Sequence, residues 1–257
     1  MGSLKERALV TIMGTAHIFD LSSRISFYIK KLKPDVVAVE LDPERYLVMK
    51  REREMKEKGM DVDIHLRDLL SSSAIPFRYR LMAYLQRRLA ASNHVFPGTD
   101  MLSAIDAARE VGATVALIDM SLRKTLANLQ NAMKPIEKVR FYFTLLTGGR
   151  IGGKKLPLSA HLRRIESDYD SVLYEIAKIY PGLKKVLIDE RDMHMARAII
   201  DISMSYENVM AVVGDAHVEG IRRIIEKEGI NVSILHLSRL MDNGFSSSNT
   251  THPHEPL

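Results

Sequence analysis

The chain has 257 residues, of which 46% are hydrophobic and 27% are charged, and it contains no cysteine and no tryptophan. This composition is typical of a globular protein and excludes a disordered chain, a collagen-like repeat and a disulfide scaffold. The absence of cysteine also excludes thiolate nucleophiles, iron–sulfur clusters and cysteine-ligated zinc. Any metal ion must therefore bind imidazole and oxygen ligands.

The formal net charge is +5 and the isoelectric point is about 9.3. A basic excess indicates nucleic acid or an anionic surface only where it is clustered. Basic residues gather at 78–88 and at 154–164, but no zinc finger, RNP motif or Walker loop accompanies them. We expect solvated helix surface there and no nucleic-acid partner.

No segment approaches the roughly 18–20 uninterrupted apolar residues of a membrane-spanning helix. The first residues, MGSLKERALVTIMG, lead directly into a strand-like run and lack the apolar core of a signal peptide. We therefore expect a soluble, cytoplasmic protein from the sequence as given.

Short apolar runs alternate with amphipathic segments along the chain. The patterns predict strands at 8–13, 36–41, 113–119, 209–214 and 230–237. Between them they predict helices at 21–33, from Pro43 into 50–58 with Asp42 as the N-cap, within 61–92, at 100–111 and at 216–228. Residues 121–205 are predicted to be almost continuous helix, interrupted by a flexible turn at 147–155. This alternation is typical of an α/β fold with a central, largely parallel sheet flanked by helices.

The domain organisation that follows is a single α/β domain over residues 1–242. Helical insertions are expected at about 43–92 and 121–205, and a disordered polar tail at 243–257. The longer insertion suits a lid, a dimer interface or a membrane-facing surface equally well.

One pattern occurs twice: TIMGTAHI at 11–18 and AVVGDAHV at 211–218. Each unit is a buried strand followed by Gly-x-Ala-His, which places His17 and His217 just beyond the carboxyl end of a strand. Ligands of open α/β sheets bind at that edge. The glycine permits a close approach, and we expect each imidazole to leave the core. The alternative is a buried, hydrogen-bonded structural histidine.

Acidic and basic residues near the same edge are further candidates. Glu40 ends the second strand and is predicted to be a metal ligand or a general base, or else a carboxylate satisfied by a helix N-terminus. Asp119 closes the third strand and faces the same edge. Asp100, in the first turn of a helix, and Arg45, which we expect to face solvent, are weaker candidates.

Four charged residues, 189–192, interrupt an otherwise apolar helical run at 187–200. A period of 3.6 places Glu190 on a stripe with Met193 and Ile200, and Arg191 on another stripe with Met195. Buried charges are costly unless paired, so these side chains should meet each other, the strand-end glutamate or a ligand. The alternative is a cluster of ion pairs on a half-exposed helix face.

The segments GTAH, PDVVAVELDPERY, PGTDMLSAIDAAREVGATVALID, DERDMHMARAI and VMAVVGDAHVEGI follow one another between about residues 8 and 222. Together they resemble the TraB family, also called pheromone-shutdown or PrgY-like proteins. The resemblance implies a place in a wider superfamily with Tiki peptidases, ChaN haem-binding lipoproteins and erythromycin esterases. It also implies an α/β core in which paired Gly-x-x-His motifs and glutamates line one cleft.

In Tiki-like members these residues are associated with metal-dependent peptide cleavage. By motif, His17 and His217 match the two histidines, and Glu40 matches the glutamate after the second strand. Glu190 and Arg191 match the Glu-Arg pair of the late helix.

The chain departs from the family pattern in three places. Family members often have Glu in place of Asp100, and an Asp-Arg pair where this chain has Asp119-Met120. Many also carry a hydrophobic C-terminal membrane region, whereas this chain ends in a polar tail. Membrane association is thus expected only through a region absent from this chain, and a homo-oligomer is left open.

The leading functional hypothesis is a metal-dependent hydrolase, most simply a peptidase (metalloprotease) acting on small peptides. His17, His217 and Glu40 would hold a divalent metal (Mn, Co or Zn) that activates water. Glu40 or Glu190 would transfer the proton, and Arg191 would stabilise the oxyanion. In a metal-free variant, a His–Glu pair activates water directly.

Two alternatives stay open: a binding module that sequesters a peptide or another small ligand, and a regulatory protein with a vestigial cleft. A nucleotide enzyme and a serine hydrolase are disfavoured, because no Gly-x-Gly-x-x-Gly, Walker lysine or Gly-x-Ser-x-Gly is present.

Overall fold

The computed structural model describes residues 8–15, 21–59, 99–139, 150–151, 154–155 and 180–236. The predicted helices within 61–92, the polar tail at 243–257 and His17 lie outside the described residues. The predicted single-domain boundaries therefore stay a prediction.

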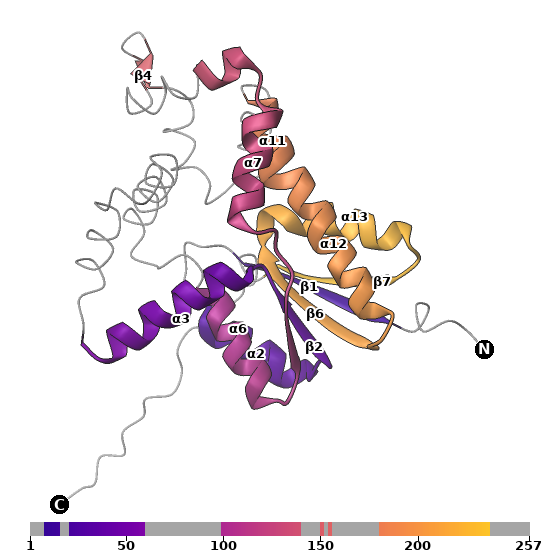
Figure 1. Ribbon diagram of the computed structural model, residues 1–257. Helices are drawn as coiled ribbons and strands as arrows, with labels where there is room; N and C mark the ends of the chain where they lie inside the picture. Colours follow the sequence, from indigo (N-terminus) through magenta and orange to yellow (C-terminus); the bar gives the residue numbers. More distant parts are fainter. Residues whose placement is uncertain are drawn as a thin grey trace, which may run out of the picture.

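The described elements follow the predicted order of strands and helices (Figure 1). The strands are β1 (Leu9–Thr15), β2 (Val36–Val39), β3 (Thr114–Leu117), β4 (Arg150–Ile151), β5 (Lys154–Lys155), β6 (Asn208–Gly214) and β7 (Asn231–His236). The helices are α2 (Ser22–Leu32), α3 (Pro43–Glu57), α6 (Thr99–Glu110), α7 (Leu122–Ala132), α11 (Pro181–Lys184), α12 (Glu190–Ser203) and α13 (Asp215–Lys227).

The main sheet has five parallel strands in the order β3-β2-β6-β1-β7. The predicted α/β fold with a parallel sheet is confirmed. β1 and β6, which carry the two Gly-x-Ala-His units, are direct neighbours, and Thr15 is paired with Gly214 at their carboxyl ends. The repeated sequence pattern thus marks two adjacent strands.

Both faces of the sheet are covered, which explains why its strands are nearly continuous apolar runs. Helices α2 and α6 pack on one face, in a core that includes Met13 and Val37. Helices α12 and α13 pack on the other face, in a core that includes Ile12 and Ala211 (Figure 1). Successive side chains of β1 therefore enter opposite cores, as the pleat of a strand requires.

Helix α3 begins as the sequence predicts. Asp42 is its N-cap, and Oδ1 of Asp42 accepts hydrogen bonds from the backbone N–H groups of Glu44 (3.0 Å) and Arg45 (3.2 Å). Pro43 occupies the first turn, where its missing N–H has no intrahelical partner to lose.

Two local features differ from the predicted helical block at 121–205. Within the predicted flexible turn, β4 and β5 pair antiparallel, with Arg150 opposite Lys155. Gly-Gly lies between them in the sequence, a residue pair that favours two-residue connections. Between α11 and α12 the backbone forms a π-helical turn, Lys185–Asp189, which inserts one residue into the helical phase.

Within the described ranges, no helix combines the length and the apolar character that crossing a bilayer requires.

We predict that Gly14→Ala destabilises the fold by about 1–3 kcal/mol, the usual cost of overpacking. A Cβ at position 14 would overlap Oδ1 of Asp215 and lie 2.9 Å from Cγ2 of Val218. Chemical denaturation should show a smaller cost of the same substitution in an Asp215→Ala background. Equal costs in both backgrounds would show that the Asp215 carboxylate is not what requires a glycine here.

Candidate active site

The candidate site lies where the chain leaves the sheet in opposite directions. After β1 the chain continues to α2 on one face, and after β6 it continues to α13 on the other (Figure 1). In open α/β sheets such a divergence between adjacent parallel strands opens a crevice at their carboxyl ends. The polar residues described next gather at this edge.

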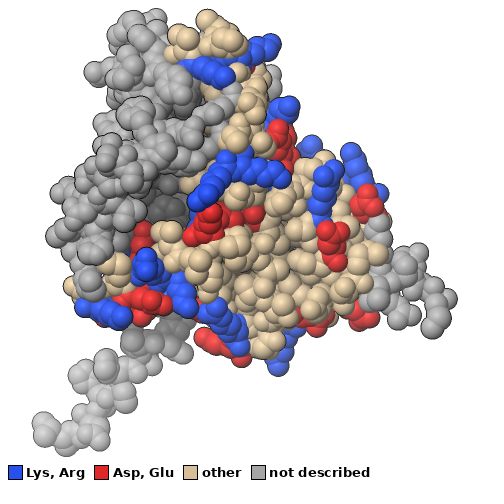
Figure 2. Space-filling view, in the orientation of Figure 1, with Lys and Arg blue, Asp and Glu red and all other residues tan. Residues whose placement is uncertain are grey.

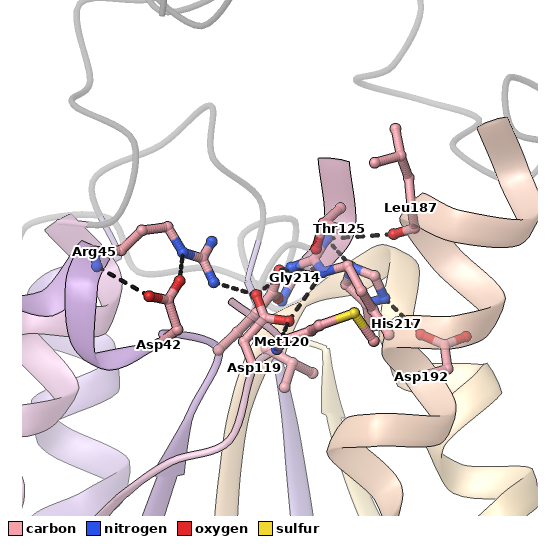
Figure 3. Close-up of polar contacts among 12 residues, drawn as sticks. Asp42, Arg45, Asp119, Met120, Thr125, Leu187, Asp192, Gly214 and His217 are labelled. Atoms are coloured by element: carbon pink, nitrogen blue, oxygen red, sulfur yellow. Dashed lines mark hydrogen bonds and ion pairs between the residues drawn. The ribbon is translucent and has the colours of Figure 1, made fainter. Parts of the chain in front are cut away.

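Arg191, the second residue of α12, is at the centre of the polar cluster, and its side chain is only 15% exposed. Its Nε donates to Oδ1 of Asp119 at 3.0 Å, and its Nη2 donates to Oδ2 of Asp119 at 2.6 Å and to Oε1 of Glu40. Figure 3 shows the dashed contacts that end on Asp119. Nη1 donates to the carbonyl of Leu187 at 3.3 Å. The expected pairing of Arg191 with Glu40 is therefore present.

Burial alone would lower the pKa of Arg191, but the hydrogen bond to Asp119 and the charge of Glu40 outweigh it. The net pKa lies above the ordinary value for arginine. Arg191 is a permanent cation in a largely buried position.

Glu40 lies just after β2, at the predicted edge. Its Oε2 accepts the backbone N–H of Gly214 at 2.7 Å, and its Oε1 accepts from Arg191. Gly214 is the N-cap of α13, so Glu40 is stabilised in part by a helix N-terminus. The alternative of a carboxylate satisfied by a helix N-terminus is therefore present, and the role of Glu40 as a metal ligand or general base stays a prediction. The same carboxylate also lies 3.5 Å from Nε2 of His217.

His217 lies in the first turn of α13 and is only 4% exposed, so the expectation that its imidazole leaves the core is wrong. A carboxylate partner makes this burial tolerable: Nδ1 lies 2.5 Å from Oδ1 of Asp192. Nε2 lies 3.2 Å from Nη1 of Arg191 and 3.5 Å from Oε1 of Glu40. Because a guanidinium can only donate, we assign the ring proton to Nδ1, which donates to Asp192.

Asp192 is the site residue that the sequence patterns missed. Burial raises its pKa, while the hydrogen bond to His217 opposes that rise. Room for its carboxylate comes from Gly220 on α13, where a Cβ would overlap Oδ2 of Asp192. A glycine inside a helix costs about 1 kcal/mol relative to alanine, so Gly220 is the sequence signal that could have indicated a close approach.

Among the contacts between described residues, Glu190 has none with Glu40 or His217. Its side chain is 28% exposed, and its Oε2 accepts from Nδ2 of Asn128 at 2.7 Å. The stripe that Glu190 shares with Met193 is not the buried face of α12, because Met193 is exposed and the buried face carries Asp192 instead. A helical period fixes which residues share a face, not which face is buried.

Arg45 extends the cluster on the side of α3, so the expectation that it faces solvent is corrected. Its Nε donates to Oδ2 of Asp42 at 2.5 Å, and its Nη2 donates to Oδ2 of Asp119. Oδ1 of Asp119 also accepts the backbone N–H of Met120 at 2.7 Å. Asp119, with a side chain only 1% exposed, thus joins two arginines, as its predicted position at the edge required.

The remaining candidates are less informative. Asp100 is buried in the first turn of α6, the position in which an acid was expected. His236, for which the sequence showed no pattern, lies at the end of β7, and its Nδ1 is 2.8 Å from Oδ1 of Asp215. His17 lies outside the described residues.

The predicted metal site can be tested against the donor atoms that are described. Nε2 of His217 and Oε1 of Glu40 converge, but the guanidinium of Arg191 contacts both atoms. A divalent cation would compete there with a fixed positive charge. Among the described residues, no three His, Asp or Glu side chains are grouped as metal ligands.

Figure 2 shows charges of both signs interspersed on one face of the molecule. On α13, Arg222 pairs with Glu219 and Glu226, and Arg223 also pairs with Glu219. The hydrogen bond from Arg222 lowers the pKa of Glu219 to about 2. Such pairs at helical spacing are typical of a solvated helix face.

The order of these motifs and the fold that carries them define a known family. Residues 3–234 match the TraB/PrgY/gumN family, so the chain belongs to this family. "Uncharacterized protein MJ1365" of Methanocaldococcus jannaschii is 28% identical over an alignment of 237 residues that covers 90% of this chain. The chain spans 57% of the length of that archaeal relative.

We predict that Asp119→Asn destabilises the fold by about 3–5 kcal/mol, because it leaves two arginines with one buried carboxylate fewer. The matched control is Asp106→Asn. Asp106 also pairs with an arginine of α3, Arg53, but its side chain is largely solvated, so the expected cost is below about 1 kcal/mol. Urea denaturation of both variants measures the difference, and similar costs would contradict a central role of Asp119.

Proposed function

We propose that this chain is a hydrolase that cleaves peptide bonds, with His217 as the group that takes the proton from the attacking water. The observation that carries the proposal is the placement of His217. Asp192 accepts a hydrogen bond from Nδ1 and so orients the ring, and Nε2 on the other side of the ring faces Glu40 and Arg191 at the sheet edge. A histidine oriented by a carboxylate is the usual arrangement of a general base.

The same geometry supplies charge stabilisation. Nε2 accepts from Arg191 while the imidazole is neutral. Nε2 can take a proton from water only after this contact breaks, because its single lone pair cannot accept from both, and the protonated ring and Nη1 then repel each other. Nη1 is then free to stabilise the oxyanion that forms on the attacked carbonyl.

Two carboxylates stabilise the protonated imidazole. Asp192 accepts from Nδ1 at 2.5 Å, and Oε1 of Glu40 is 3.5 Å from Nε2. The proton then passes from Nε2 to the leaving amine, which restores the neutral ring. Because Glu190 accepts a hydrogen bond from Asn128, we assign Glu190 no role in this proton transfer.

The sequence hypothesis of a bound Mn, Co or Zn remains a prediction that depends on His17. A carboxylate behind a histidine, as Asp192 is behind His217, is also the usual support of a metal-ligating imidazole. The contact of Arg191 with the same donor atoms opposes this form. The described geometry therefore favours the metal-free variant.

A second candidate is a non-catalytic module that binds a peptide or another small ligand. The specific observation in its favour is the contact between Nε2 of His217 and Arg191, which occupies the lone pair that a base requires. Homo-oligomer formation, membrane association through another region and a place beside the Tiki peptidases also stay predictions.

Turnover of a random tetrapeptide mixture, followed by mass spectrometry, tests the hydrolase. His217→Ala should lower the rate by about 100-fold or more, the usual contribution of a positioned base. His194→Ala, which removes a half-buried histidine of α12 outside the cluster, is the matched control and should keep the rate. Binding of peptides without cleavage by the unmodified protein would support the binding module instead.

Chelation and elemental analysis separate the two forms of the hydrolase. The metal-free form predicts that turnover survives exhaustive treatment with EDTA. Near-stoichiometric Mn, Co or Zn that is lost in His17→Ala and in His217→Ala, but kept in His194→Ala, would establish the metal-dependent form.

A further inference from the structure

Arg45 is held by one edge of its guanidinium. Nε donates to Oδ2 of Asp42 at 2.5 Å, and Nη2 donates to Oδ2 of Asp119. Both carboxylates have side chains only 1% exposed, so they fix the guanidinium in one orientation. An immobilised arginine has already lost the rotamer freedom that a ligand would otherwise have to restrict.

The opposite edge of this guanidinium meets no acceptor from the described part of the chain. The side chain of Arg45 is 31% exposed, and among the described residues Nη1 has no hydrogen-bond partner. In Figure 3 the dashed lines leave the side chain from Nε and from one terminal nitrogen, and the other terminal nitrogen points away from both carboxylates. With respect to the described residues, Nη1 and the second hydrogen of Nη2 therefore form a two-donor fork without an acceptor.

The hydrogen-bond inventory of the cluster indicates what this fork can bind. Both oxygens of Asp42, of Asp119 and of Glu40 already accept a hydrogen bond. All three nitrogens of the Arg191 guanidinium donate to acceptors on the protein. What Arg45 offers is donors, so its ligand must supply acceptors, and a carboxylate matches the spacing and planarity of the fork.

We propose that Arg45 binds a carboxylate of the substrate. This inference rests on the proposed peptidase function, for which it names the substrate class: peptides that present a carboxylate, either at the C-terminus or on an Asp or Glu side chain. Asp119 accepts from both Arg45 and Arg191, and Arg191 contacts His217. A carboxylate bound at Arg45 is thus connected to His217 through the side chains of Asp119 and Arg191.

Asp42 and Asp119 offset the charge of Arg45, so general attraction of anions contributes little. The affinity must come from the two directed hydrogen bonds of the fork. Lysine keeps the positive charge but lacks the fork, so Arg45→Lys should lose the preference nearly as fully as Arg45→Gln.

The test uses two pools of random tetrapeptides, one with a free C-terminal carboxylate and one with a carboxamide, each made with and without Asp and Glu. Equilibrium dialysis measures retention by the unmodified protein, and turnover is followed in the same samples. We expect carboxylate-bearing peptides to be retained about 10- to 100-fold better than carboxamide peptides that lack Asp and Glu, as charge-assisted hydrogen bonds allow.

Three variants complete the design. Arg45→Lys and Arg45→Gln should abolish the preference, whereas Arg53→Gln, a change to another arginine of α3 that pairs with Asp106, should keep it. Loss of Arg45 removes a partner from two buried carboxylates, so thermal melting accompanies each variant. If one Arg45 variant does not fold, the other gives the comparison, and equal retention of all pools by the unmodified protein overturns the inference in any case.

The outcomes distinguish the inference from the proposed function. A preference for free C-termini, or only for Asp- and Glu-containing peptides, that is lost in Arg45→Lys supports the inference and identifies the source of the carboxylate. Equal retention of all pools overturns it, even if peptides are cleaved, and so does a preference that survives Arg45→Lys. Arg45-dependent retention without cleavage supports the carboxylate site and contradicts the hydrolase.

Discussion

The arrangement of the candidate site depends on one buried guanidinium. Arg191 on α12 meets Asp119 after β3 and Glu40 after β2, residues that are 72 and 151 positions away in the sequence. A charge withdrawn from water is tolerated only when its partners are placed well. The parallel sheet provides that placement, because the carboxyl ends of β2 and β3 lie at the same edge.

The second constraint is space for carboxylates. Gly14 leaves room for the side chain of Asp215, and Gly220 leaves room for that of Asp192. Each of these carboxylates contacts a histidine, His236 and His217 respectively. Gly14 and Gly220 are thus the positions at which an aspartate side chain approaches the backbone of another element.

The sheet and its edge could be predicted because they depend on local patterns. Apolar runs, the cap at Asp42 and the repeated Gly-x-Ala-His unit fixed the positions of strands and the neighbourhood of Glu40 and Asp119. The direct pairing of β1 with β6 could not be derived from any one segment.

The partners within the site were harder to predict because they depend on tertiary contacts. A helical period could not decide whether Glu190 or Asp192 faces the core, and a π-helical turn precedes both. Arg45 one turn into a helix is solvent-facing by default, and only the buried carboxylate of Asp119, distant in sequence, makes it part of the site. The burial of His217 likewise follows from Asp192, which approaches it over Gly220.

We expect Arg191 and the strand-end carboxylates to stabilise one another as one unit. A double-mutant cycle of Glu40→Gln and Arg191→Met, measured by chemical denaturation, tests it most directly. We expect a coupling of roughly 1–3 kcal/mol, with the double variant less destabilised than the sum of the single variants. Additive effects within about 0.5 kcal/mol would contradict the account, because they would show that the two side chains do not stabilise each other.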